Sequence, residues 1–329
     1  MPGGRWSTAR AKARRIRRRV AGATRWGDEL RGVRENVAAL ADALADVDRR
    51  IALRDATAVD ETDEPTTSCV CTQARCSSAS FVSWCARLGI GPELHRWHWE
   101  KVHIARSLHA GGVIGPGRRG VGFGVGGEPL VAWFAAQGCH IVATDLATSD
   151  ERSEQWSIGP AAAGAGTMAA LERPDVCPTE EFRQRVSVRA VDMNDVPTDL
   201  VGFDFCWSAC ALEHLGTLEH GLDFVVRSLD CLRPGGIAVH TTEFNVTSDD
   251  DTLVDGDVVL YRARDLHALV ERLSSAGHHV ATLDLAPGEG PFDRYAMPSD
   301  VVGTPTVKVR IDRFVSTTVA LVIRRRDEP

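Results

Sequence analysis

Short apolar segments alternate with segments of helical periodicity from Gly115 to the end of the chain. Strands that alternate with helices pair in parallel through crossover connections, so this pattern limits the fold to the α/β class with a mostly parallel, doubly wound sheet. Ligands of such sheets bind outside the carboxyl ends of the strands, where the strand order reverses. We predict helices at 130–137 and 265–276, and strands at 121–123, 140–144, 185–191, 203–208, 237–242, 279–285 and 314–324.

A glycine-rich loop, GVGFGVGGEP over 120–129, begins in the first predicted strand and leads into a helix. Glycine is needed where a ligand must lie against the backbone, because a Cβ would collide with the ligand. Gly122, Gly124 and Gly127 fit the dinucleotide pattern G-x-G-x-x-G, and Asp145 follows about 20 residues later as a candidate ribose ligand. The loop therefore predicts a nucleotide site, and a nicotinamide dinucleotide is one candidate ligand.

Gly122, Gly124 and Gly126 equally fit the pattern G-x-G-x-G. With the acids that end the second and third predicted strands, this loop resembles the class I S-adenosylmethionine-dependent methyltransferases, and the resemblance covers roughly residues 115–325. The last predicted helix and strands resemble the terminal antiparallel hairpin of that family, which a nicotinamide Rossmann domain lacks. The resemblance implies a seven-stranded, mostly parallel sheet with a terminal antiparallel hairpin, and S-adenosyl-L-methionine as cofactor.

The resemblance also implies which residues hold the cofactor. In this family, the acid that ends the second strand binds both ribose hydroxyls, and an acid after the third strand lies beside the adenine amino group, next to an apolar residue on the adenine face. The acid that the family places two residues before its first glycine is here Gly120, so we expect Glu128 or a backbone carbonyl to replace it. The predicted cofactor-binding residues are Gly122, Phe123, Gly124, Gly126, Glu128, Asp145, Leu146, Asp192, Met193 and Ser208.

The fourth predicted strand leads into SACALEHLG over 208–216, which is similar to the family's fourth motif beside the reacting methyl group. Transfer to a hydroxyl requires a base that removes its proton while nucleophile, methyl and sulfur are held in line. His214 is the first predicted base because the pKa of an imidazole lies near neutrality. Glu213 and Glu243 are the other predicted catalytic residues. Alternatively, His214 packs against the following helix, and Glu243 caps a helix or binds an acceptor hydroxyl.

The segment over 81–114 is rich in aromatic residues and histidine, and it precedes the sheet, where methyltransferases often carry a helical lid. Aromatic rings stack on sugar or acceptor rings, and histidine and carboxylate side chains bind hydroxyls. Alternatively, aromatic residues at helical spacing form core, and His240 points into the sheet. The predicted substrate-binding residues are Trp97, His98, Trp99, Glu100 and His240.

The N-terminal 34 residues are rich in arginine, whereas the whole chain has a formal charge of -7. Apolar residues then recur in steps of three and four, at Leu30, Val33, Val37, Leu40, Leu44, Val47 and Ile51. Such heptad spacing predicts a helix over 30–51 that joins copies of the chain as a coiled coil, or alternatively packs on its own domain. The predicted organisation is a basic arm and heptad helix over 1–54, a linker over 55–80, a helical lid or substrate segment over 81–114 and a cofactor domain over 115–329.

Composition excludes several classes of protein. None of the apolar runs in the 329 residues reaches the roughly 18 residues that a membrane span needs, and we see no secretory signal, so we expect a cytoplasmic protein. Nine irregularly spaced cysteines are typical of reduced thiols. We predict no metal site: Cys69, Cys71 and Cys76 lack the paired spacing of a zinc site, and the acidic run over 249–257 is expected to be solvated.

These features together predict a methyltransferase that O-methylates a polar hydroxylated small molecule, such as a sugar or a natural-product scaffold. The alternatives are an NAD-dependent oxidoreductase that uses the same glycine loop, an RNA methyltransferase that uses the basic arm, and a non-catalytic scaffold. Because the remainder of the chain is acidic, we do not expect nucleic acid as a partner. The predicted partners are a small-molecule acceptor and a second copy of the chain.

Overall fold

The computed structural model describes residues 33, 34, 36, 37, 39–51, 67–147, 149, 150, 152, 167–298 and 305–327. The chain divides into two compact units, Met1–Asp48 and Arg49–Pro329. The described residues between 33 and 51 are helical, in agreement with the heptad spacing. The basic arm up to residue 32 and the predicted linker up to residue 66 lie outside the described residues. Every helix among the described residues is too short or too polar to span a bilayer.

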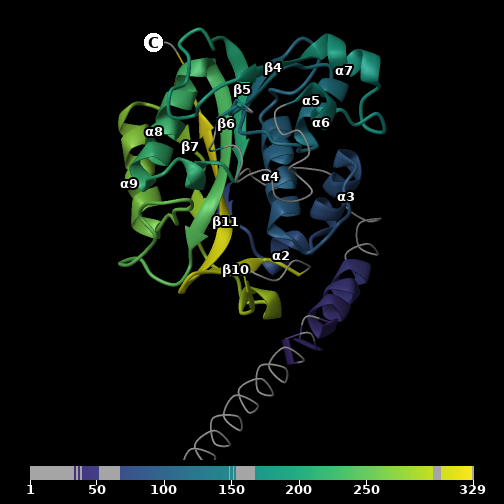
Figure 1. Ribbon diagram of the computed structural model, residues 1–329, viewed down its shortest axis with the longest axis vertical. Helices are drawn as coiled ribbons and strands as arrows, with labels where there is room; N and C mark the ends of the chain where they lie inside the picture. The colour runs from purple at the N-terminus through teal and green to yellow at the C-terminus, as the bar shows by residue number, and fades with distance from the viewer. Residues whose placement is uncertain are drawn as a thin grey trace, which may run out of the picture. The chain divides into compact units, whose positions relative to one another are not determined.

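The second unit is built on one sheet, which has eleven strands among the described residues (Figure 1). Its main path runs β4-β3-β2-β5-β6-β11-β1-β8, and β7, β9 and β10 pair off this path. The strands are β1 (Ser68–Val70), β2 (Arg119–Phe123), β3 (His140–Asp145), β4 (Val186–Ala190), β5 (Phe203–Ala209), β6 (Leu232–Asn245), β7 (His279–Val280), β8 (Leu283–Asp284), β9 (Ala296–Pro298), β10 (Lys308–Ile311) and β11 (Phe314–Arg324).

The strand order reverses at β2. β3 and β4 lie on one side of β2, and β5, which follows them in the chain, lies on the other side. β2 pairs in parallel with both neighbours, so that Gly120 is aligned with Ile141 of β3 and with Phe205 of β5. The carboxyl ends of β2 and β5 therefore flank the position where doubly wound sheets bind their ligands.

β11 is the long antiparallel strand of the sheet. It pairs with β6 from Ser316 opposite Asn245 to Arg324 opposite Ile237. The strands from β4 to β6 are parallel to one another. The predicted α/β class, with a mostly parallel sheet and an antiparallel end, is confirmed, and the bounds of β11 are those predicted.

The predicted number of seven strands is too small, and the predicted linker is too long. The predicted strand over 279–285 is divided into β7, which pairs with β11 through Val280, and β8. β1 lies between β11 and β8, and its residues Cys69 and Val70 are buried. β1 was missed because three residues after a polar segment carry little periodicity, and because its partner strands lie more than 200 positions away in the sequence.

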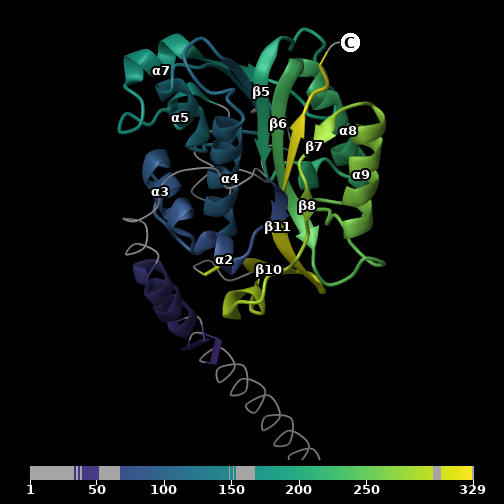
Figure 2. The same ribbon diagram turned by 180° about the vertical axis from the view of Figure 1, so that it is seen from behind.

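Helices cover both faces of the sheet (Figures 1 and 2). One face is covered by α3 (Ala79–Leu88), α4 (Arg96–Ala110) and α5 (Leu130–Ala136), and the other by α8 (Leu218–Ser228) and α9 (Ala263–Ser275). α2 (Gln73–Cys76), α6 (Met168–Leu171) and α7 (Thr179–Arg185) are shorter. Short 3-10 helices, η3 (Leu212–His214), η4 (Leu229–Cys231) and η5 (Pro291–Asp293), connect these elements. The helical segment predicted over 81–114 contains two helices, α3 and α4.

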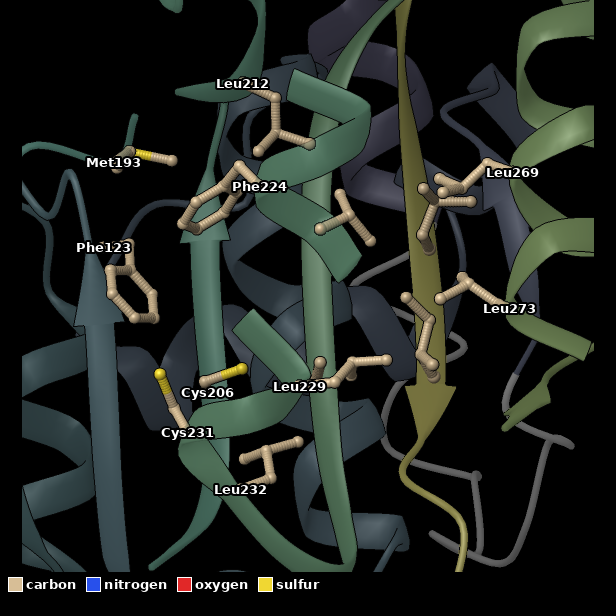
Figure 3. Packing of buried hydrophobic residues seen from close by; sticks show 14 of the residues in the cluster. Phe123, Met193, Cys206, Leu212, Phe224, Leu229, Cys231, Leu232, Leu269 and Leu273 are labelled. Carbon is tan, nitrogen blue, oxygen red and sulfur yellow. The ribbon is translucent and has the colours of Figure 1, made fainter. Parts of the chain in front are cut away.

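The core between the sheet and the pair α8 and α9 is apolar (Figure 3). Phe123 of β2 meets Phe224 of α8 edge to face, with 5.1 Å between the ring centroids. Leu269 and Leu273 of α9 point at the sheet from one helix face, as their spacing of four residues requires. Burial of these side chains is the main force that holds α8 and α9 on the sheet.

On the opposite face, aromatic side chains occupy the space beside β2. A Cβ at Gly120 would lie 2.3 Å from Phe205 Cζ, and one at Gly122 would lie 2.4 Å from Trp207 Cζ2. Glycine is therefore required at both positions by the packing of β5. The same contact explains why Gly120 replaces the acid that the family resemblance led us to expect.

Candidate functional site at the ends of the parallel strands

Gly124, just after β2, lies where three other strand ends meet. Its φ is +61°, in the left-handed region that favours glycine. A Cβ on Gly124 would lie 3.0 Å from Ala211 Cβ and 3.4 Å from Met193 Sδ. Ala211 follows β5 and Met193 follows β4, so the structure brings together the glycine loop and two of the predicted motifs.

Asp145, the last residue of β3, is held by the backbone of the glycine loop. Its Oδ2 accepts a hydrogen bond from the amide of Gly126 at 2.8 Å, and its Oδ1 accepts one from the amide of Leu146 at 2.8 Å. Burial raises the pKa of Asp145 above its ordinary value, while the two amide bonds oppose this shift. A carboxylate has about four acceptor positions, so the group retains lone pairs for two further donors, such as ribose hydroxyls.

Asp192 and Met193 follow β4 and differ in exposure. Asp192 accepts hydrogen bonds from Arg152 Nη2 at 2.8 Å and from the amide of Asn194 at 2.9 Å, and its side chain is 31 % exposed. Met193 is buried and lies near Phe123 in the core (Figure 3). The pair therefore offers an accessible acceptor next to an apolar, mostly buried side chain, and these two properties suit the edge and the face of an adenine.

Glu128, at the end of the glycine loop, is buried. It accepts a hydrogen bond from Trp207 Nε1 at 2.5 Å, and burial raises its pKa to about 8. The charge of Lys101 acts in the opposite direction on this pKa. Glu128 thus lies close enough to α4 for the charges of Lys101 and Glu100 to act on it, and its role in place of the missing acid stays a prediction.

Phe123, Ser208 and His240 were predicted to touch a ligand, and the structure buries all three side chains. Phe123 is fully buried against Phe224. Ser208 Oγ is bonded to His240 Nδ1 at 2.8 Å, and His240 Nε2 is bonded to Ser228 Oγ at 2.9 Å. Burial lowers the pKa of His240 to about 3, so it is a neutral core histidine whose two ring nitrogens are both used. The alternative that His240 points into the sheet describes its contacts, and ligand contacts of Phe123 and Ser208 stay a prediction.

Three buried carboxylates, Glu100 of α4, Glu213 of η3 and Glu243 of β6, gather around Cys210. Each is less than 5 % exposed. Cys210, just after β5, has a φ of 45°, and its amide donates to the carbonyl and the hydroxyl of Thr241 at 3.1 and 3.0 Å. Its thiol donates to Glu100 at 2.7 Å. We call these four residues, with Arg96, the carboxylate cluster.

Glu243 is neutralised by a buried arginine. Arg96, the first residue of α4, forms an ion pair with Glu243 Oε1, and Ser316 Oγ of β11 donates to the other carboxylate oxygen. The side chains of Arg96 and Glu243 are 8 and 5 % exposed. The charge of Glu243 is one of the effects that raise the pKa of Arg96. Arg96 and Ser316 thus hold the two carboxylate oxygens of Glu243, and contact of Glu243 with an acceptor stays a prediction.

Glu213 has a different environment from Glu243. Its Oε2 accepts a hydrogen bond from Thr242 Oγ1 at 2.8 Å. Burial, and next the negative charge of Glu243, raise the pKa of Glu213 to about 8. At neutral pH this group is therefore largely protonated, which makes it a hydrogen-bond donor and a poor base.

His214 is the predicted catalytic residue with partial access to solvent. Its side chain is 25 % exposed, and its Nδ1 lies 2.7 Å from the carbonyl oxygen of Asp257. A carbonyl only accepts, so Nδ1 carries the proton and Nε2 carries the lone pair of the neutral ring. Burial lowers the pKa of His214, which favours this neutral form. The amide of His214 donates a hydrogen bond to the carbonyl of Ala211, and Ala211 is the residue that lies against Gly124.

Cys210, Glu213 and Glu243 each place one ligand atom within 4.8 Å of the others. Thiolate and carboxylate groups bind metal ions when their lone pairs are available to the ion. Arg96 already binds Glu243, the Cys210 thiol donates to Glu100, and burial raises the pKa of Cys210 well above its ordinary value. These groups are arranged to bind one another, and we assign no ion to them.

The predicted substrate segment divides into exposed and buried residues. Trp97 is 51 % exposed, and His98 Nδ1 is bonded to the carbonyl of Gly91 at 2.7 Å. Trp99 is buried and stacks on His103, with 4.9 Å between the ring centroids, as the alternative of a core aromatic residue implies. Trp97 remains a predicted acceptor contact.

Sequence reasoning missed Arg96 and the role of Cys210. Arg96 lies 147 positions from Glu243, so no local pattern connects them. The signal that was present is an arginine at the start of a helix whose buried face is largely apolar and also holds Glu100. Cys210 lies inside the motif over 208–216, but only the position of its thiol against Glu100 distinguishes it from a core cysteine.

No family model and no curated protein matches the sequence. The structure is similar to a sarcosine dimethylglycine methyltransferase from Galdieria sulphuraria, at 16 % identity and a TM-score of 0.33 over 53 % of this chain and 52 % of that one. It is similar to phosphoethanolamine N-methyltransferase 2 of Haemonchus contortus, at 17 % identity and a TM-score of 0.37, over 54 % of this chain and 37 % of that one. It is also similar to the amino pentose methyltransferase CalS10 of Micromonospora echinaspora, at 16 % identity and a TM-score of 0.40, over 70 % of this chain and 91 % of that one. The aligned part is about half of the first structure and just over a third of the second.

Proposed function

We propose that this chain is an S-adenosyl-L-methionine-dependent methyltransferase that methylates a hydroxyl of a polar small molecule. The observation that carries the proposal is the meeting of strand ends at Gly124. The left-handed glycine loop, the carboxylate of Asp145 and the sulfur of Met193 come together at the switch point of the sheet. This is the position at which an α/β sheet of this order binds a nucleoside.

The residues present fit this cofactor. Gly126 has a φ of +52°, and a Cβ there would meet no atom within 4 Å, so the loop faces open space at this residue. Asp145 would hold the ribose hydroxyls, Asp192 the adenine amino group, and Met193 the adenine face. When bound, the cofactor would supply a methyl group on a cationic sulfur for in-line transfer to the acceptor.

His214 is the proposed general base. Its neutral ring is fixed by the carbonyl of Asp257, so the Nε2 lone pair would take the proton of an acceptor hydroxyl. A pKa below the ordinary value keeps the ring ready to accept that proton at neutral pH. The partly exposed side chain gives it an access that Glu213 and Glu243 lack.

Glu213 and Glu243 would act on the site through charge and position. Glu243 is bound by Arg96 and Ser316, and Glu213 is largely protonated at neutral pH, so neither is a suitable base. The charge of Glu243 raises the pKa of His214 and so opposes the effect of burial. We therefore propose them as positioning residues, in place of the catalytic role that the sequence predicted.

The two main alternatives differ in the ligand they require. An NAD-dependent oxidoreductase would use the same loop, but the antiparallel strand β11 beside β6 is the feature that a nicotinamide Rossmann domain lacks. An RNA methyltransferase would use the basic arm, which lies outside the described residues. The antiparallel end of the sheet therefore supports the methyltransferase over the oxidoreductase.

Calorimetric titration with S-adenosylhomocysteine and with NADH tests the proposal. We expect binding of S-adenosylhomocysteine alone, and Asp145→Asn should weaken it by about tenfold or more, since hydrogen bonds to a charged group contribute about 1.5–3 kcal/mol. Asp199→Asn, which changes an exposed aspartate outside the site, is the matched control and should bind normally. His214→Gln should also bind normally, yet lose transfer of labelled methyl to a panel of glycosides. Binding of NADH alone, or of neither ligand by folded protein, would refute the proposal.

A further inference from the structure

The helix over residues 33–51 exposes its apolar side chains in one row. We call these residues the heptad row; with their exposed fractions they are Val33 (58 %), Val37 (42 %), Leu40 (72 %), Leu44 (41 %), Val47 (49 %) and Ile51 (53 %). Elsewhere in the described part of the chain, only Trp97, Val201 and Val254 are large, hydrophobic and exposed. Most of the exposed aliphatic surface is thus concentrated on one face of one helix.

The spacing of the heptad row indicates what kind of surface would cover it. Steps of four and three residues alternate from Val33 to Ile51, which gives the narrow stripe of a coiled-coil seam. A helix that packs on a globular domain needs a wider stripe, which would include a third apolar position in each heptad. The flanking positions are Arg34, Asn36, Ala41, Ala43, Asp48 and Arg50, of which only the two alanines are apolar. The row therefore fits a second helix of the same period.

Burial on this helix falls outside the heptad row. Ala41 and Ala45 are only 9 and 8 % exposed, although they are the smallest side chains of the helix, whereas the adjacent Leu40 and Leu44 are 72 and 41 % exposed. Within this helix, the burial thus falls beside the heptad row and leaves its leucines exposed.

We propose that the heptad row binds the same row of a second copy of this chain. The row contains no charged residue, so two copies would not bring like charges together within the seam, and the charged residues beside it, Arg34, Asp48 and Arg50, are of both signs. Burying the exposed part of the row in both copies would remove on the order of 1,000 Å² of surface, about the lower limit for a specific interface. We therefore expect a reversible dimer that dissociates on dilution.

Sedimentation of the full chain over a range of concentrations tests this inference. We expect the dimer mass at high concentration and the monomer mass on dilution. Leu40→Glu together with Leu44→Glu should raise the dimer dissociation constant by about 100-fold or more, since each buried leucine contributes at least a factor of ten. Val201→Glu together with Val254→Glu changes two valines that are exposed to a similar degree outside the row, and this control should still dimerise.

The thermal melting midpoint of both variants should equal that of the unchanged protein at a concentration where all are monomers, which shows that the second unit is folded. A monomer at every concentration would overturn the inference and indicate that another kind of molecule covers the row. A dimer that survives the leucine changes, or is lost in the valine control, would place the interface elsewhere and overturn it as well. The outcome is independent of cofactor binding, so it is separate from the proposed function.

Discussion

The two faces of the central sheet hold their helices by different means. Toward α8 and α9, the packing is mainly apolar: Phe224, Leu269 and Leu273 lie in the core, and His240 on this side is neutral and bonded to Ser208 and Ser228. Toward α4, successive positions of β6 present Thr241 and Glu243, which bind Glu100 and Arg96. Alternation along one strand thus places an apolar core and a charged cluster on opposite sides of the same backbone. The apolar face tolerates many side chains of similar size, whereas the charged face depends on particular pairs.

The largest change in stability is expected when Arg96 is replaced, which tests whether the charged face depends on this ion pair. Arg96→Met leaves the buried carboxylate of Glu243 without its counter-ion, so we expect the free energy of unfolding to fall by about 3–5 kcal/mol. Urea unfolding followed by circular dichroism measures this change. Arg189→Met, which removes an exposed partner of Asp199, should leave the stability nearly unchanged.

A double variant distinguishes the loss of a pair from the loss of packing. Arg96→Met with Glu243→Met removes both charges, and we expect it to recover a large part of the stability lost in Arg96→Met alone. If Arg96→Met proved as stable as the unchanged protein, the account of the charged face would be wrong.

A smaller effect is the dependence of stability on pH. The pKa of Glu213 is about 8 in the folded protein and near its ordinary value of 4.5 when unfolded. Between these values the folded state binds the extra proton, so stability should fall as pH rises, by up to about 1.4 kcal/mol per pH unit. Unfolding midpoints measured from pH 5 to pH 8 report this slope.

Glu128 has a raised pKa of about 8 for the same reason, so it contributes in the same direction. Glu213→Gln should therefore reduce the slope without abolishing it, whereas Glu219→Gln, on the exposed side of α8, should leave it as it is. An unchanged slope in Glu213→Gln would contradict the assignment of a buried, protonated carboxyl to this position.

The apolar face and the strand ends were the predictable part of the molecule. Alternation and glycine spacing predicted β2, β3, β5 and β11 to within two residues, and they placed Asp145 beside the glycine loop. These features are local, because a strand pattern and the acid that ends it lie within a few residues of each other. Parallel pairing then brings the strand ends together wherever the intervening segments lie.

The charged face was not predictable, because its pairs are distant in sequence. Arg96 and Glu243 come from α4 and β6, and Glu100 and Cys210 from α4 and the end of β5. His240 shows that a residue type alone can also mislead. A histidine suggested a ligand-binding group, but both ring nitrogens of His240 are hydrogen-bonded inside the core, to Ser208 and Ser228. The exposure of a polar residue depends on contacts between segments that are distant in sequence, and the periodicity of one segment does not predict such contacts.

The central claim, that a nucleoside binds at the ends of β2, β3 and β4, is tested most directly by amide hydrogen exchange with and without S-adenosylhomocysteine. The account predicts slower exchange on binding at 122–126, 145–146 and 192–194, and unchanged exchange in α9. Slower exchange confined to other segments, or no change at these strand ends under saturating ligand, would contradict it.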